Sequence, residues 1–286
     1  MSYKDLYTSD SPKISTGGKE SNIYVLGIPF DFTSSYRPGS RFGPDSVRQA
    51  YWNIEIVDRE LNVNAENIPI FDLGNISPIM SVDGMIDIVK KVAGEAFAQG
   101  KVLGSIGGEH LITLPIASQL KDATIVVFDA HFDLRDELYG LKVNHATFFR
   151  RLLELKQIKA VHVGAHAYLD EELQFARNLG VTVISQESLK NDRRFLLDAL
   201  PDNPLYISVD MDVLDPSCAP GVGNPEPSGL TYNELFNALR SLKGKKIVGF
   251  DVNEVTPPYD PSGITSIAAA KLFSILVILS WVGING

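Results

Sequence analysis

Residues 124–133, Thr124-Ile125-Val126-Val127-Phe128-Asp129-Ala130-His131-Phe132-Asp133, decide the fold class that the sequence predicts. The first half is a β-branched apolar run, which is typical of a strand buried on both faces of a parallel sheet. The second half places Asp129, His131 and Asp133 at alternate positions. Because alternate side chains of an extended backbone share one face, we expect these three side chains to enter one cavity.

This cluster of two carboxylates and an imidazole indicates a divalent metal site. Such groups desolvate and repel one another unless a positive charge lies between them. The alternative is a loop at the end of a strand, whose polar residues are exposed by chance.

Length and composition limit the class of protein. The chain has 286 residues, 44% hydrophobic and 21% charged, which suits a single α/β domain over residues 1–286. Cys218 is the one cysteine, and residues 1–5 show no secretory pattern, so we expect a cytoplasmic protein without a disulfide framework. The formal charge of −9 argues against nucleic acid or an anionic membrane as partner. It suits a cationic small molecule, or simply a soluble protein.

Periodicity predicts strands alternating with helices. Strands are expected at residues 22–28, 101–106, 124–128, 161–165, 181–184, 205–210 and 246–251. Helices are expected over about 82–99, from 110 to 120, over 144–155, and after residue 44, where Val47, Ala50, Tyr51 and Ile54 form an apolar face. This alternation predicts a three-layer α/β/α fold with a central, mainly parallel sheet.

Three further segments leave alternatives open. Residues 1–20 are polar and suggest a loosely held arm or sheet edge. Residues 31–44, rich in Gly, Pro and Ser, form either a functional loop or a rigid turn. The apolar run 264–282 contains Lys271 near its middle, so we interpret it as a core helix and not as a membrane span.

Polar motifs also follow three other predicted strands, and we expect them to lie near the cluster of Asp129, His131 and Asp133. Gly107-Gly108-Glu109-His110 presents His110, Ser208-Val209-Asp210-Met211-Asp212 adds two carboxylates, and Glu254 follows a third strand. Asp215, which precedes Pro216, is expected to turn the chain. The candidate ligands are His110, Asp129, His131, Asp133, Asp210 and Asp212. This oxygen-rich set favours Mn²⁺ over Zn²⁺, and two divalent ions would balance the charge of four aspartates.

These motifs resemble those of the ureohydrolase family of arginases and agmatinases. The resemblance runs from about Gly27 to the end, and it includes Arg37-Pro38-Gly39-Ser40-Arg41-Phe42-Gly43-Pro44. The segments 225–230 and 254–260 favour the agmatinase branch. The resemblance implies an arginase-like fold, two Mn²⁺ ions, and trimers or hexamers of the chain.

The resemblance also implies a role for each site residue. His110 and Asp133 would bind one ion, His131 and Asp212 the other, and Asp129 and Asp210 would bridge both. Glu254 would hold the guanidinium group of the substrate, and His145 would bind substrate and shuttle protons. Asn144, Ala146 and His166 depart from the family pattern, so the recognition of the far end of the substrate stays open.

The expected reaction is hydrolysis of a guanidino substrate by a hydroxide that bridges the two metals. Asp133 would pass a proton to the leaving nitrogen, and His145 would exchange protons with solvent, unless His145 only bonds a loop carbonyl. His162, inside an alternating strand, is expected to be a satisfied core histidine.

Agmatine, hydrolysed to putrescine and urea, is the expected substrate. Aminopropylagmatine, guanidinobutyrate, arginine and formimidoylglutamate are alternatives, and Arg37 or Arg41 would be the anchor for a carboxylate. A zinc deacetylase is disfavoured, because no His-His pair is present to activate water at one metal. A metal-binding subunit without catalytic activity is the alternative from another class.

Overall fold

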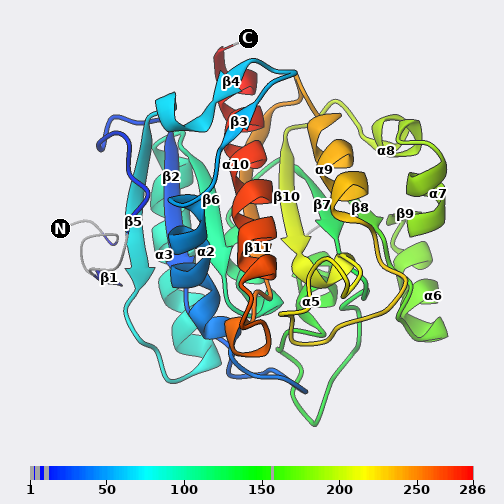
Figure 1. Cartoon of the computed structure of the whole chain (residues 1–286). Helices are drawn as coiled ribbons and strands as arrows, with labels where there is room; N and C mark the ends of the chain where they lie inside the picture. Colours follow the sequence, from blue (N-terminus) through cyan, green and yellow to red (C-terminus); the bar gives the residue numbers. More distant parts are fainter. Residues whose placement is uncertain (1–2, 4–6, 10–12, 156–157, 286) are drawn as a thin grey trace.

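The computed structural model describes residues 3, 7–9, 13–155 and 158–285, which form a central sheet between two layers of helices (Figure 1). The strands of these residues lie in the order β1 (Thr8–Ser9), β5 (Ile70–Ile76), β2 (Ile23–Ile28), β6 (Val102–Gly107), β11 (Ile247–Asn253), β10 (Leu205–Asp210), β7 (Thr124–Phe128), β8 (Ala160–Val163) and β9 (Thr182–Ile184). Every neighbouring pair is parallel except β1 with β5. The predicted three-layer, mainly parallel fold is confirmed.

The two helical layers cover opposite faces of the sheet. One contains α2 (Gly43–Tyr51), α7 (Gln186–Asn191), α8 (Arg194–Ala199), α9 (Tyr232–Arg240) and α10 (Ile264–Asn285). The other contains α3 (Val82–Ala98), α4 (Thr113–Ala117), α5 (Phe148–Leu155) and α6 (Asp170–Asn178). Shorter elements are the hairpin β3 (Val57–Asp58) with β4 (Val63–Asn64) and the 3-10 helices η1 (Ser40–Phe42), η2 (Ala65–Asn67), η3 (His110–Ile112), η4 (Met211–Val213) and η5 (Pro257–Tyr259).

The central strands form where the sequence predicts them, because their apolar runs are buried on both faces. All residues of β7 and β10 are buried, and both strands have the predicted bounds. Residues 8–9 form the edge strand that the N-terminal segment suggested.

Some predicted helices are shorter in the structure. The helix expected over 144–155 begins at Phe148, because Asn144 Oδ1 accepts from Ala146 N (2.9 Å) and turns the chain before it. The helix expected over 110–120 is η3 followed by α4, and Ile54 lies beyond the end of α2.

Strand β5 was not predicted, because Asp72, Gly74 and Asn75 interrupt its apolar pattern. Arg48 of α2 explains why these polar side chains are buried. Its Nε lies 2.8 Å from Asp72 Oδ2 and its Nη1 lies 2.6 Å from Asn75 Oδ1. A bidentate guanidinium of this kind satisfies buried acceptors that local sequence leaves unexplained.

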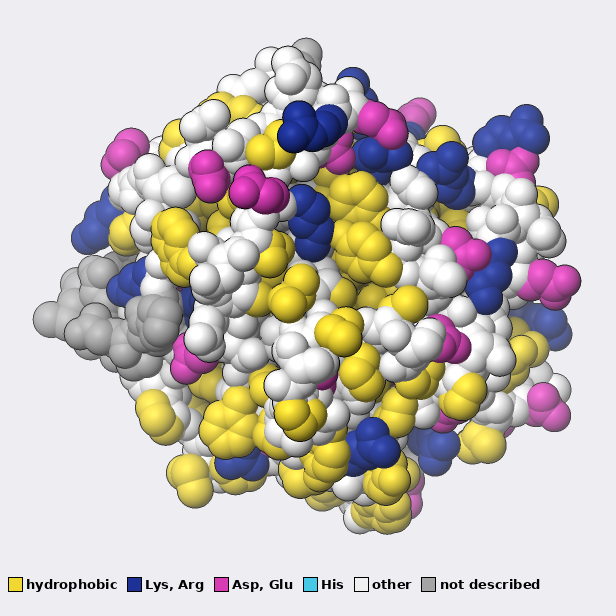
Figure 2. Space-filling view, in the orientation of Figure 1, with side chains coloured by type: hydrophobic (Ala, Val, Ile, Leu, Met, Phe, Trp, Pro, Cys, Tyr) yellow, Lys and Arg dark blue, Asp and Glu magenta, His cyan; other side chains and the backbone are white. Residues whose placement is uncertain are grey.

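Helix α10 is long and apolar enough to cross a membrane by composition, yet 67% of its most apolar window is buried within the structure. It lies against α2 and β11, at the core position that the sequence predicted. Figure 2, drawn from the side on which α10 lies in front, shows apolar side chains exposed over much of this face. Ile264 and Ile267 of α10 are among the large apolar side chains that remain exposed.

Candidate metal centre

The carboxyl ends of β6, β11, β10 and β7 are neighbours in the sheet, and each strand leads into a predicted site residue. Parallel strands place their following loops at one edge, where α/β proteins gather their functional groups. His110 follows β6, Glu254 follows β11, Asp210 ends β10 with Asp212 just beyond it, and Asp129, His131 and Asp133 follow β7.

The loop after β7 converges by a different backbone from the one expected. The strand ends at Phe128, so its three ligands lie beyond the extended chain. His131 N donates to Asp129 Oδ1 (2.7 Å), and Asp133 has a φ of 52°. A non-glycine residue in this left-handed region is uncommon and is held there by its surroundings. The prediction of an extended ligand run was therefore wrong.

Gly108 allows the loop after β6 to lie against the end of β2. Its amide donates to Ile28 O (2.8 Å), and Glu109 N donates to Phe30 O (2.8 Å). A Cβ at Gly108 would lie 2.0 Å from Phe30 O, so a side chain cannot be accommodated. This close approach delivers His110 to the sheet edge.

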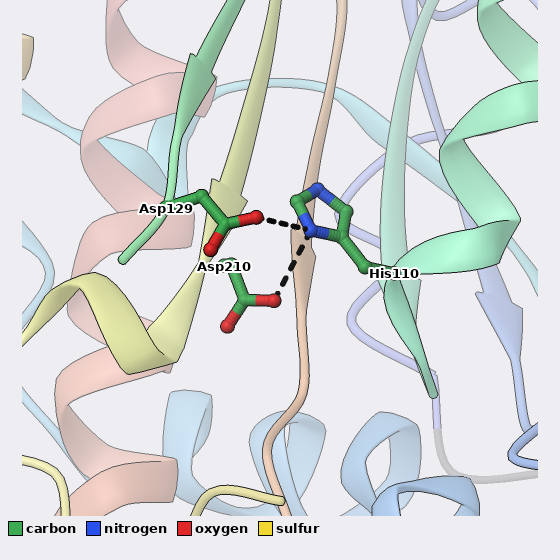
Figure 3. A group of neighbouring side chains, drawn as sticks. All are labelled: His110, Asp129 and Asp210. Atoms are coloured by element: carbon green, nitrogen blue, oxygen red, sulfur yellow. Dashed lines mark ion pairs between the residues drawn. The ribbon is translucent and has the colours of Figure 1, made fainter. Parts of the chain in front are cut away.

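His110 faces three carboxylates. Its Nδ1 lies 3.0 Å from Asp129 Oδ2 and 3.1 Å from Asp210 Oδ2 (Figure 3). The same nitrogen lies 3.4 Å from Asp133 Oδ2. Among the described residues, His110 Nδ1 and Asp129 Oδ2 are buried atoms without a hydrogen-bond partner of normal geometry. The two atoms face each other across 3.0 Å.

A second group forms around His131. Its Nδ1 lies 2.9 Å from Asp212 Oδ2 and 3.6 Å from Asp129 Oδ1. Asp129 therefore directs one oxygen to each histidine. The ligand atoms of His110, Asp129 and Asp210, and those of Asp129, His131 and Asp212, lie within 4.8 Å of one another in each group.

These residues fit a pair of divalent cations. The four aspartates are buried and carry a formal charge of −4, which two divalent ions balance. Burial opposes the charged forms of His110 and His131, yet the neighbouring carboxylates hold the pKa of both well above its ordinary value. Burial raises the pKa of Asp133 to about 7, and the charge of Asp129 adds to this effect. Bound cations would favour the ionised carboxylates and the neutral imidazoles, because their positive charge replaces that of the protons.

A cavity of about 440 Å³ opens beside the cluster. Glu254 lines it with a φ of 62°, and its Oε1 accepts from His110 N (2.8 Å). Burial, and then the charge of Glu109, raises the pKa of Glu254 well above its usual range. A guanidinium ion bound beside it would restore the carboxylate, because an opposite charge favours the ionised form.

Two further charged residues line the cavity. Glu226 Oε1 lies 3.5 Å from His131 Nε2, and 37% of the Glu226 side chain is exposed. Arg135 is half-buried, and its guanidinium has no hydrogen bond or ion pair within the described part of the chain. Arg41 pairs instead with Asp31, and Arg37 lies over the rings of Tyr36 and Tyr259.

His145 also lines the cavity and is held by the loop over residues 31–44. Its Nδ1 lies 3.3 Å from Thr33 Oγ1, its Nε2 lies 3.2 Å from Ser35 Oγ, and Thr33 Oγ1 donates to Glu109 Oε1 (2.6 Å). Burial, and then the positive charge of His131, lowers the pKa of His145 to about 4. The loop over residues 31–44 was expected to be either a functional loop or a rigid turn. It has features of both, because its side chains are held by hydrogen bonds and contact the site.

Of the three departures from the family pattern, Ala146 lines the cavity, while Asn144 and His166 are not among its lining residues. Asn144 turns the chain before α5. His166 places Nδ1 2.9 Å from Gly164 O and Nε2 3.2 Å from Pro227 O, which joins the end of β8 to the loop that carries Glu226.

Two structural expectations can be checked at the same edge. Asp215 turns the chain, because its carboxylate accepts from Ser217 N and Ser228 N (both 2.9 Å). His162 is in the core, but the expectation that it is satisfied was wrong, since neither ring nitrogen has a partner among the described residues.

Sequence reasoning missed four residues that line or support the cavity: Thr33, Ser35, Arg135 and Glu226. Thr33 and Ser35 lie in the loop that was noted as a possible functional segment. Arg135 follows Asp133 by two residues and Glu226 follows Asp212 by fourteen, and no spacing rule marks either residue.

Comparisons with known proteins agree with this geometry. The model of the arginase family matches residues 21–278. The chain is 37% identical to the agmatinase of Pyrococcus horikoshii, with 92% of this chain and 93% of that protein covered. It is 36% identical to the N(1)-aminopropylagmatine ureohydrolase of Thermococcus kodakarensis, with 93% and 94% covered. The crystal structure of agmatine ureohydrolase of Thermoplasma volcanium has a TM-score of 0.88 and 34% identity, with 99% and 98% covered.

Proposed function

The chain belongs to the arginase family, and from this premise we propose that it hydrolyses agmatine to putrescine and urea. One observation carries the proposal. Glu254 and four of the six candidate ligands (His131, Asp133, Asp210 and Asp212) line one cavity, and the Glu226 carboxylate lines it too, 3.5 Å from His131 Nε2. A substrate with a guanidinium at one end and an ammonium at the other matches the carboxylates of Glu254 and Glu226.

We propose two Mn²⁺ ions, because carboxylate-rich donor sets with few imidazoles suit this ion. His110 and Asp133 would hold one ion, His131 and Asp212 the other, and Asp129 and Asp210 both. When bound, such a pair supplies a nucleophilic hydroxide at neutral pH, because it lowers the pKa of bound water.

Glu254 would orient the planar guanidinium through Oε2, since His110 N already occupies Oε1. The Asp133 carboxylate would accept a proton from the attacking group and release it to the leaving nitrogen. His145 is neutral at pH 7, because its pKa of about 4 lies well below that pH, so its ring would hold a proton only transiently as it passes one between the site and solvent. These steps leave putrescine and urea.

A second candidate substrate is guanidinobutyrate. Arg135 favours it, because an unpaired guanidinium in the cavity wall would bind a carboxylate at the far end of the substrate. Glu226 therefore favours a positive charge, and Arg135 a negative charge, at the end of the substrate away from the guanidinium group.

The test is urea release after Mn²⁺ loading from agmatine, guanidinobutyrate, aminopropylagmatine and arginine. We expect agmatine to be hydrolysed fastest. Glu254→Gln should lose most of this activity, while Glu187→Gln, an exposed control on α7, should retain it. Turnover of another member of the panel with agmatine inert would overturn the substrate. Urea release from none of them would overturn the reaction and favour a metal-binding subunit.

We also propose that residues 1–286 form one domain of a cytoplasmic homo-oligomer, a trimer or hexamer, without nucleic acid or membrane partners. The exposed apolar side chains of α10 and the lone Cys218 support this proposal. Light scattering after size-exclusion chromatography is the check, and a monomer at micromolar concentration would contradict it.

A further inference from the structure

A buried polar chain leads away from the metal centre on the far side of His110. His110 Nε2 lies 2.8 Å from Ser208 Oγ, and Ser208 Oγ donates to Asp251 Oδ1 (2.6 Å). All three residues are buried. The proposed function assigns no role to Ser208 or Asp251.

Sheet register explains how this chain of hydrogen bonds arises. Ser208 of β10 pairs with Asp251 of the parallel strand β11. Tyr206, Ser208 and Asp210 alternate along β10 and so share one face of the sheet. The same face therefore carries a metal ligand at its end and a buried hydroxyl directly behind that ligand.

Asp251 is an acceptor with four donors around it. Ser208 Oγ and Asn253 Nδ2 (2.7 Å) donate to Oδ1, while Thr113 Oγ1 (3.0 Å) and Tyr206 Oη donate to Oδ2. Ser208 Oγ also lies 3.2 Å from Thr113 Oγ1, but Thr113 donates its own hydrogen to Asp251, and the shorter contact with the Asp251 carboxylate takes the hydroxyl hydrogen of Ser208. A serine hydroxyl has a single hydrogen, so toward His110 it can only accept.

A histidine that binds a metal ion must be neutral, and a neutral imidazole carries one N–H. With Ser208 as acceptor, that proton of a metal-binding His110 lies on Nε2, which leaves a lone pair on Nδ1. Nδ1 is the atom that faces Asp129, Asp133 and Asp210. The Phe148 ring, with its centroid 4.2 Å from that of His110, restricts rotation of the imidazole.

We propose that Asp251, acting through Ser208, is a positioning residue for the metal centre: it fixes His110 in the Nε2–H tautomer with Nδ1 directed at the ion. A metal-binding histidine needs its second nitrogen held by an acceptor, and loss of that acceptor typically costs 10–100-fold in metal affinity. The inference rests on the metal pair of the proposed function, but it needs neither the substrate nor turnover.

Calorimetric titration of the metal-free full chain with Mn²⁺ tests the proposal. Ser208→Ala removes the acceptor, so we expect about 10–100-fold weaker binding of one ion. Ser208→Cys, which keeps the size of the side chain with a poorer acceptor, should weaken the same step, and Asp251→Asn should weaken it less. Tyr206→Phe is the matched control, because it removes a bond to Asp251 and leaves Ser208 and His110 in place. It should bind both ions within about threefold of the wild type, well short of the loss for Ser208.

A spectroscopic readout separates positioning from packing. In Zn²⁺-loaded protein with ¹⁵N-labelled histidine, the Nε2 proton of His110 should exchange slowly in the wild type and in Tyr206→Phe, and rapidly in Ser208→Ala. Wild-type affinity for both ions in both Ser208 variants would overturn the proposal, as would an equal loss in Tyr206→Phe. Absence of urea release from a wild type that binds both ions would overturn the proposed reaction and leave this inference standing.

Discussion

His162 is a buried imidazole in β8, and neither ring nitrogen has a hydrogen-bond partner of normal geometry among the described residues. Its ring lies between Phe132 and Phe149, with centroids 4.9 and 5.9 Å away. Burial lowers the pKa of His162 to about 4. Sequence alternation placed this residue in the core, but it gave no information on whether the ring would find a partner, because partners come from other elements.

Replacement of His162 by Leu should make stability less sensitive to acid. A histidine whose folded-state pKa lies below its unfolded value of 6.5 stabilises the fold above pH 6.5, and this stability is lost as the pH falls toward 4. Between pH 7.5 and pH 5 this loss is about 2 kcal/mol for His162. Urea unfolding at the two pH values measures it. Phe149→Leu, which changes packing beside the same ring, should keep the wild-type pH dependence; equal slopes in the wild type and His162→Leu would contradict the prediction.

Neutral substitutions at Glu226 and at Arg135 distinguish agmatine from guanidinobutyrate as the substrate. Glu226→Gln should raise KM for agmatine about tenfold, because a charge-assisted hydrogen bond contributes about 1.5–3 kcal/mol. Butylguanidine lacks the terminal amine, so its kcat/KM should not change. Arg135→Gln should leave agmatine kinetics near wild type. The opposite result would be that Arg135→Gln abolishes guanidinobutyrate turnover while Glu226→Gln leaves turnover unchanged. Guanidinobutyrate, and not agmatine, would then be the substrate.

At the scale of elements, a glycine just after β6 and a glycine within α3 differ in the space around them. Gly108→Ala would place a Cβ 2.0 Å from Phe30 O, which is backbone and cannot rotate away. Gly94 lies within α3, where a Cβ would meet Gln119 Oε1 at 3.4 Å.

We expect opposite effects from the same substitution at these two positions. Gly108→Ala should destabilise the protein by at least about 2 kcal/mol and weaken metal binding, because the collision moves the loop that carries His110. Gly94→Ala should stabilise it by up to about 1 kcal/mol through helix propensity. Denaturant unfolding and Mn²⁺ titration of both variants are the measurements. A Gly108→Ala protein with wild-type stability would show that the approach to Phe30 is not required.

Elements with a strong local pattern could be predicted, and those stabilised by distant partners could not. β7 and β10 are continuous apolar runs, so their bounds followed from sequence. β5 depends on Arg48, which lies more than 20 residues away in the chain, and its pattern was therefore not recognised. The six candidate ligands were proposed from motifs at strand ends, and their side chains lie at one edge of the sheet, whereas the left-handed backbone of Asp133 left no local signal.

On the scale of the whole molecule, the sheet brings ligands from three separated segments to one edge, and their charges oppose folding. Four buried aspartates gather there, and burial raises the pKa of Asp210 well above its ordinary value, with the charges of Asp212 and Asp129 adding to the effect. Folding therefore creates a site whose repulsion a bound cation would offset. Ions that bind the folded chain and not the unfolded chain must stabilise it.

Removal of metal should accordingly lower Tm, and Mn²⁺ should restore it in a concentration-dependent manner. At free Mn²⁺ of about 100 times Kd, each ion contributes about 2.7 kcal/mol, with about 1.4 kcal/mol more for every further tenfold increase. Thermal unfolding after chelation, followed by Mn²⁺ addition, measures this. Asp129→Asn weakens the ligand that faces both histidines, so it should reduce the Mn²⁺-dependent rise more than Asp170→Asn, an exposed control in α6. A wild-type Tm that does not respond to Mn²⁺ would mean that these six side chains do not bind ions in the native state, and the proposed reaction would then lack its nucleophile.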